Sequence, residues 1–183
     1  MNSMSRYYDC DPCNRDQYDP CGKGHYDPCN KKPEHECQTI IKCGCPNSIT
    51  IPAATVLGTT FTLATLTLNT CKLKDPCIKL EFASNLVAAV AFTGSLNIQV
   101  FKQCGNQITP TPVGPAWAFN LVALLSSQTF SFFVCDCNDT CCNDCCCTYT
   151  VVATVTSAVT VGTLAVNNAT LGAVATCGSN SCC

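Results

Sequence analysis

The sequence has few of the residues with which enzymes transfer protons. Its 183 residues include two histidines, His25 and His35, and both lie near the start of the chain. The carboxylates beyond residue 45 are Asp75, Glu81, Asp136, Asp139 and Asp144. They form no recognisable acid–base pair and stand beside no nucleophile, and the chain has no glycine-rich phosphate loop. These absences predict a protein that is not an enzyme and needs no cofactor.

Other absences narrow the class of protein further. No apolar run approaches the length of a transmembrane helix, and apolar residues rarely recur at helical spacing. Only residues 121–125 resemble a single helical turn. The start, MNSMSRYYDCDPC, has no apolar stretch, so we expect no signal peptide. A net charge of −2 gives no electrostatic reason to expect nucleic acid or an acidic membrane as a partner.

Cysteine, by contrast, is abundant. The 20 cysteines exceed the level typical of disulfide or metal scaffolds, and residues 135–147 read CDCNDTCCNDCCC. This segment lies between two predicted strands, so we expect a hairpin whose loop is a cluster of thiols. Disulfides belong to oxidising compartments, which conflicts with the expected lack of a secretion signal. The conflict ends if the thiols bind metal, if export is unusual, or if the producing cell lyses.

Composition divides the chain into three parts. Residues 1–45 form a charged, low-complexity arm in which Asp-Pro-Cys recurs every eight residues, at 11–13, 19–21 and 27–29. Residues 46–177 form a weakly charged body, and residues 178–183 form a cysteine-containing tail. A surface with so little charge is suited to burial against copies of itself.

The body predicts an all-β fold with about eight strands, most simply a jelly-roll β-sandwich. Pro52 indicates an edge or bulged strand, and a change of alternation near Ala64 and Thr65 indicates a bulge. Asn167 and Asn168 suggest the turn of a final hairpin between strands at 159–166 and 169–175. The other predicted strands lie at 60–68, 78–82, 86–92, 96–101, 130–134 and 149–155, and residues 109–115 are predicted to be a loop.

Metal binding is one reading of the central cysteines. Cys135, Cys137, Cys142 and Cys145 have the close spacing of a thiolate cluster, and soft sulfur ligands select zinc, copper(I) or iron–sulfur. No second C-x-x-C motif follows at the distance of a zinc finger, and no histidine lies nearby.

Disulfides explain more of the cysteine pattern. Cys71 and Cys77 flank a short loop and predict an intrachain bond, either with each other or from one of them to Cys104. The cysteines of the arm are not needed to hold the body together, so we expect them to reach another molecule. So many cysteines allow too many pairings for the sequence to assign them.

A short β-like segment, Thr39, Ile40, Ile41 and Lys42, lies between Cys37 and the pair Cys43 and Cys45. One interpretation is a connector strand that adds to the open sheet edge of a neighbouring copy. Such a head-to-tail contact generates filaments or stacked rings, which the flanking cysteines would lock. The other interpretation is the first strand of the chain's own domain. The sequence leaves both open.

Several segments resemble the cysteine-containing β-domain of endospore appendage (Ena-type) subunits of spore-forming Firmicutes. They are PCIKLEFASN, NIQVFKQCGNQITPTPVGPAW, TFSFFVCDC, CTYTVVATVT and NNATLGAVATC, and the resemblance covers about residues 37–177. It implies a jelly-roll subunit that self-assembles by strand augmentation into a disulfide-linked fibre. By the same resemblance, the linking cysteines are Cys37, Cys43 and Cys45, and the receiving thiols are Cys104, Cys135 and Cys137.

The resemblance also implies a location and partners. Such subunits are made in the mother-cell cytoplasm without a signal peptide and become oxidised on the endospore surface. The main partner would be the protein itself, with other spore coat or exosporium proteins as further candidates. The long arm and the dense cysteines at 141–147 depart from the family pattern. They keep two alternatives open, a thiolate metal-binding protein and a cross-linked coat component without a regular lattice.

Overall fold

The computed structural model describes residues 37–88, 91–105, 107–123, 125–137 and 146–178. These residues form nine strands and no helix, so no helix in the described ranges could span a membrane. The strands are β1 (Ile40–Cys43), β2 (Asn47–Ile51), β3 (Thr60–Asn69), β4 (Pro76–Ala88), β5 (Phe92–Cys104), β6 (Thr111–Ala123), β7 (Ser126–Asp136), β8 (Cys146–Val155) and β9 (Leu164–Cys177). The predicted all-β class is confirmed.

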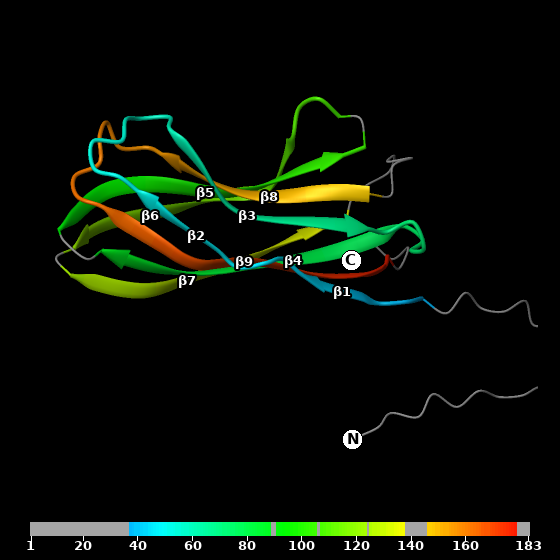
Figure 1. Cartoon of the computed structure of the whole chain (residues 1–183). Helices are drawn as coiled ribbons and strands as arrows, with labels where there is room; N and C mark the ends of the chain where they lie inside the picture. Colours follow the sequence, from blue (N-terminus) through cyan, green and yellow to red (C-terminus); the bar gives the residue numbers. More distant parts are fainter. Residues whose placement is uncertain (1–36, 89–90, 106, 124, 138–145, 179–183) are drawn as a thin grey trace, which may run out of the picture. The chain divides into compact units, whose positions relative to one another are not determined.

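Two antiparallel sheets pack face to face (Figure 1). The first, which we call the β9 sheet, has the order β1-β9-β4-β7, with β2 also paired to β9; the second, the β8 sheet, has the order β3-β8-β5-β6. β1 and β2 pair with successive parts of the same edge of β9. If β1 and β2 are counted as one strand, the two sheets have the eight strands of a jelly roll, as expected.

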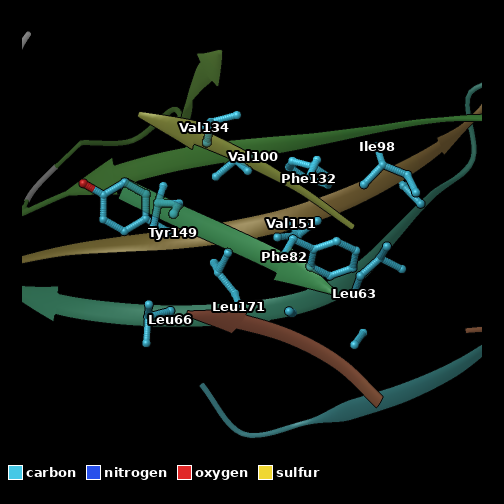
Figure 2. Packing of buried hydrophobic residues seen from close by; sticks show 14 of the residues in the cluster. Leu63, Leu66, Phe82, Ile98, Val100, Phe132, Val134, Tyr149, Val151 and Leu171 are labelled. Atoms are coloured by element: carbon cyan, nitrogen blue, oxygen red, sulfur yellow. The ribbon is translucent and has the colours of Figure 1, made fainter. Parts of the chain in front are cut away.

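The core lies between the inner faces of the two sheets. Along the strands side chains alternate between the two faces, and most of the inward positions are apolar, with Ser84 and Lys102 as exceptions. Phe82 and Leu171 of the β9 sheet meet Leu63 and Val151 of the β8 sheet in this layer (Figure 2). Burial of apolar area at about 25 cal/mol per Å² makes this contact the main source of stability.

The bulge predicted in β3 is present. The register between β3 and β8 shifts between Thr62 and Ala64, and Leu63 and Ala64 are both buried. Because the bulge adds one residue, the side chains of Leu66 and Leu68 point into the core. β2 ends at Ile51, directly before Pro52.

The loop predicted at 109–115 extends only to residue 110, and residues 121–123 of the predicted helical turn are strand. β6 runs from Thr111 to Ala123 and carries both Pro112 and Pro115. In the described sheet it pairs with β5 alone, so its prolines do not interrupt a ladder on both sides. The apolar residues at 121–123 continue this edge strand.

The final hairpin was also wrongly predicted. β9 is one continuous strand from Leu164 to Cys177. Asn168 has a φ of 55°, and the pairing with β4 shifts register between Ala83 and Asn85. The permissive asparagine therefore forms a bulge within the strand, because β2 and β4 flank β9 on both sides there.

Two further boundaries differ from expectation. β4 is a single strand where the sequence suggested separate strands at 78–82 and 86–92. The sandwich also begins before residue 46, because β1 is hydrogen-bonded into the β9 sheet.

Gly162 and Gly58 provide a test of the packing. Both have a left-handed φ, +74° and +82°, but only at Gly162 would a Cβ overlap the carbonyl oxygen of Ala91. Gly162→Ala should cost about 3 kcal/mol or more, whereas Gly58→Ala should cost about 1 kcal/mol, the backbone penalty alone. Urea unfolding of the oxidised variants measures both values, and equal losses would contradict the close approach of Gly162 to Ala91.

Candidate cross-linking surface

Among the described residues, three disulfides lie at one end of the sandwich. They join Cys37 to Cys177, Cys77 to Cys137 and Cys104 to Cys147, and each of these cysteines lies at or near the end of a strand. The sequence separations are 140, 60 and 43 residues. In the chain-entropy description each bond, taken alone, destabilises the unfolded chain by roughly 4–5 kcal/mol.

These pairs differ from the expected assignment. Cys37, Cys104 and Cys137 were expected to link subunits, and each instead pairs within the chain. Cys77 does form an intrachain bond, but with Cys137 and not with Cys71 or Cys104.

Strand register explains the pairing. Ile78 lies opposite Asp136, which brings the neighbouring Cys77 and Cys137 together. Cys104 lies directly opposite Cys147 across β5 and β8. Cys71 is exposed in the turn after β3, where its backbone N–H donates to Oδ1 of Asn69.

Apart from Cys71, four described cysteines are exposed thiols outside these disulfides: Cys43, Cys45, Cys135 and Cys146. Cys43 and Cys135 lie on the outer face of the β9 sheet, at opposite edges: Cys43 on β1 and Cys135 on β7. Three strand spacings separate the two edges, or about 14 Å. One face of the domain therefore presents a thiol on each side, and Cys45 lies just beyond β1.

A shallow groove of about 510 Å³ lies on the same outer face. The surface is hollowed there because the lining residues Gly172, Ala83 and Ser131 have small side chains or none. Phe133 forms one wall with 59% of its surface exposed, and Lys79 Nζ lies 5.2 Å from the centre of its ring. Phe133 lies on the same strand as Cys135, and an exposed phenylalanine beside a thiol makes this face suited to contact with another surface.

These disulfides leave fewer cysteines for the predicted thiolate metal cluster. Cys137 is in a disulfide, which removes it as a metal ligand, and Cys142 and Cys145 lie outside the described residues. Across the described ranges, no group of three or more His, Cys, Asp or Glu side chains is placed to hold a metal.

The predicted connector strand lies on its own domain. Ile40 pairs with Ala175, Ile41 with Val174 and Lys42 with Ala173, while Thr39 precedes the strand. Ile41 remains 74% exposed. Four residues of pairing and the Cys37–Cys177 bond hold this strand on the edge of β9.

A family described as a domain of unknown function, DUF4489, matches residues 37–176. The chain belongs to the DUF4489 family. The match includes β1 to β8 and all of β9 except its last residue, so the DUF4489 domain coincides with the jelly roll. No curated protein is detectably similar to the chain.

Solved structures resemble the DUF4489 domain only distantly. A structure of the Gx strain of infectious bursal disease virus matches with 8% identity and a TM-score of 0.43 over 75% of this chain and 37% of that one. The DUF4489 chain thus spans little more than a third of the viral chain. A CBM28 module specific for non-crystalline cellulose matches with 15% identity and a TM-score of 0.33, over 62% and 73% of the two chains. A CBM4 structure matches with 7% identity and a TM-score of 0.30, over 72% of this chain and 92% of that one. Values this low carry no argument about function.

The three disulfides should differ in their access to reductant. Cys37 is exposed, whereas Cys104 and Cys147 are only 2% and 7% exposed. Mild reductant should therefore open Cys37–Cys177 about tenfold or more faster than Cys104–Cys147, because exchange requires access to the sulfur. Timed alkylation with mass mapping measures the rates, and concentrated urea is the control in which the difference should vanish. Equal rates in the native protein would contradict the buried placement.

Proposed function

We propose that this DUF4489 protein is a non-enzymatic subunit that self-assembles into a disulfide-linked fibre on the endospore surface. One observation carries the proposal: the domain closes itself with three internal disulfides and still exposes Cys43 and Cys135 at opposite edges of one face. A subunit with one reactive thiol on each side can link two neighbours. A repeated head-to-tail link that does not close on itself produces an open filament.

Noncovalent contacts would align the subunits before oxidation. In the described sheets, β6 and β7 each have one hydrogen-bonded neighbour, so each leaves an edge that another strand can join. β7 also carries Phe133 and Cys135, which places an apolar contact beside a thiol. Addition of a neighbour's segment along β7 would bring the two chains within reach of a covalent bond.

Exchange of β1 offers a second contact between subunits. If β1 of one copy replaces β1 of the next, the same pairs, such as Ile40 with Ala175, form between chains. The Cys37–Cys177 bond would then join two subunits, as the resemblance to endospore appendage proteins implies for Cys37. No new interaction is needed, because the exchanged strand reproduces the described register.

The location follows from the resemblance. A subunit made in the mother-cell cytoplasm meets oxidant when that cell lyses, which reconciles 20 cysteines with the expected lack of a signal peptide. The partners are then copies of the same chain and, secondarily, other coat or exosporium proteins. Assembly of this kind requires neither nucleic acid nor a membrane.

Electron microscopy of the protein purified without reductant should show uniform fibres or stacked rings. Denaturant should disperse them quickly only when reductant is also present, because disulfides make dissociation slow. Dispersed particles would contradict self-assembly, and amorphous aggregates would favour the cross-linked coat component instead.

Single cysteine variants locate the links. Cys43→Ser, Cys45→Ser and Cys135→Ser should each shorten the ladder of covalent oligomers seen on a non-reducing denaturing gel. Cys146→Ser is the matched control, since Cys146 is also exposed but begins β8 in the other sheet. An undiminished ladder in all three variants would remove these thiols from the joint.

A further inference from the structure

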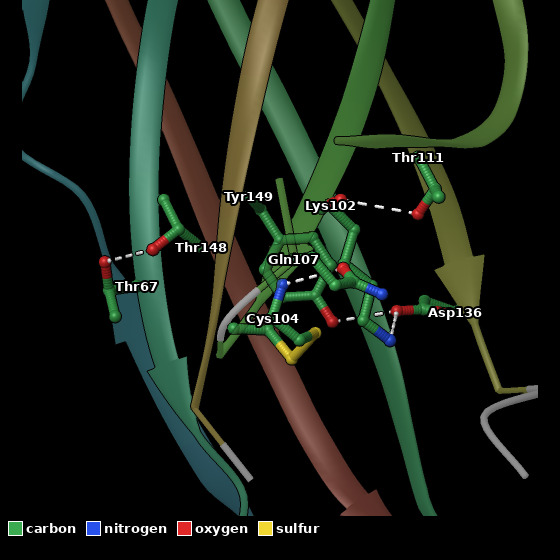
Figure 3. The surroundings of a disulfide bond; sticks show 9 residues. Thr67, Lys102, Cys104, Gln107, Thr111, Asp136, Thr148 and Tyr149 are labelled. Atoms are coloured by element: carbon green, nitrogen blue, oxygen red, sulfur yellow. Dashed lines mark hydrogen bonds and ion pairs between the residues drawn. A yellow bond between two sulfur atoms is a disulfide. The ribbon is translucent and has the colours of Figure 1, made fainter. Parts of the chain in front are cut away.

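Lys102 is a lysine in the core. It lies near the end of β5, and only 7% of its surface is exposed. A buried ammonium group is costly unless a partner compensates for its lost hydration. Nζ of Lys102 lies 3.0 Å from Oδ2 of Asp136, whose side chain is 14% exposed. Because β5 belongs to the β8 sheet and β7 to the β9 sheet, this pair bridges the two layers (Figure 3).

Tyr149 completes the cluster from β8. It is fully buried, and its hydroxyl donates a 2.8 Å hydrogen bond to the same Oδ2 of Asp136. Nζ of Lys102 lies 6.0 Å from the centre of the Tyr149 ring. Oδ2 of Asp136 therefore contacts the ammonium of Lys102 and accepts a hydrogen bond from the phenol of Tyr149, in a space from which most water is excluded.

The strands that carry the cluster are fixed on each side. Cys104–Cys147 lies two residues beyond Lys102 and two before Tyr149, and Cys77–Cys137 is adjacent to Asp136. Thr111 donates through its hydroxyl to the carbonyl oxygen of Lys102 at 3.3 Å. The three reactive groups are thus held in place with little freedom to separate.

This arrangement suits amide formation. A contact of 3.0 Å from Nζ to Oδ2 places Nζ roughly 3.3 to 3.8 Å from the carboxyl carbon, close to the separation of about 3 to 3.5 Å from which attack proceeds. Groups held so close react with very high effective concentration.

We propose that Lys102 and Asp136 condense without any other protein to form an isopeptide bond between the two sheets. A proton passes from the ammonium of Lys102 to the carboxylate of Asp136. Nζ attacks Cγ, and the Cγ–Oδ2 bond breaks as Tyr149 donates a proton to the departing oxygen. The proton lost from nitrogen restores the phenol. One amide and one water molecule are formed from one ammonium and one carboxylate, and nothing is oxidised or reduced.

The full-length, folded chain tests this directly. After complete reduction and alkylation, its intact mass should be lower than the sequence predicts by one water molecule. Lys102 is the last basic residue in the chain, so trypsin should no longer separate residues 80–102 from residues 103–183. A second protease should release a branched peptide that contains both residues.

Three variants separate the bond from its alternatives. Lys102→Arg keeps a buried cation but cannot form the amide, so it should show the full mass of its sequence. If the arginine variant does not fold, Lys102→Met should also show the full mass of its sequence. Tyr149→Phe should still lose water but about 100-fold more slowly, because it lacks the proton donor.

Two results would overturn the proposal. The first is a folded protein with all three disulfides, the full sequence mass and complete cleavage after Lys102, which would leave a simple ion pair. The second is loss of water with cleavage after Lys102 intact, which would indicate a cyclised aspartate. Either result comes from the monomer and is independent of fibre formation.

Discussion

The contact between the inner faces of the two sheets decides which side chains of each strand point inward and which point outward. Successive residues of a strand point to opposite faces, so filling the interface with apolar side chains also decides which residues face outward. Cys135 and Phe133 lie outward because Phe132 and Val134 lie inward. The thiol face and the buried cluster thus share one cause, since Asp136 follows Cys135 and turns back into the sandwich.

The fold was largely predictable where the pattern is local. The alternation in β3 and β8 identified those strands and their inward faces, and the change of phase in β3 predicted its bulge. Prediction failed where a residue has different roles in different surroundings. Asn168 suits a tight turn and a bulge equally, and only β2 and β4, which lie far away in sequence, select the bulge. The prolines of β6 are acceptable because the strand is at an edge, which no local pattern indicates.

The disulfide partners could not be predicted, because they depend on which distant strands become neighbours and in what register. Cys147 and Cys177 were not among the candidate site residues, although both lie at strand ends. Lys102 was also missed, but the sequence did contain a signal. It continues the inward series of Leu96, Ile98 and Val100, while Asp136 continues that of Phe132 and Val134. A charged residue in the inward phase of each of two strands is a reason to look for a pair.

The Cys37–Cys177 bond also determines how the domain bears mechanical load. Tension applied through the chain before Cys37 would otherwise peel β1 from β9 one hydrogen bond at a time. With the disulfide in place, that tension crosses the sulfur–sulfur bond directly to the end of β9. β9 is an interior strand, flanked by β4 on one side and by β1 and β2 on the other. Its ladders would then share the load along their length, so the short strand at the edge is shielded from the pull.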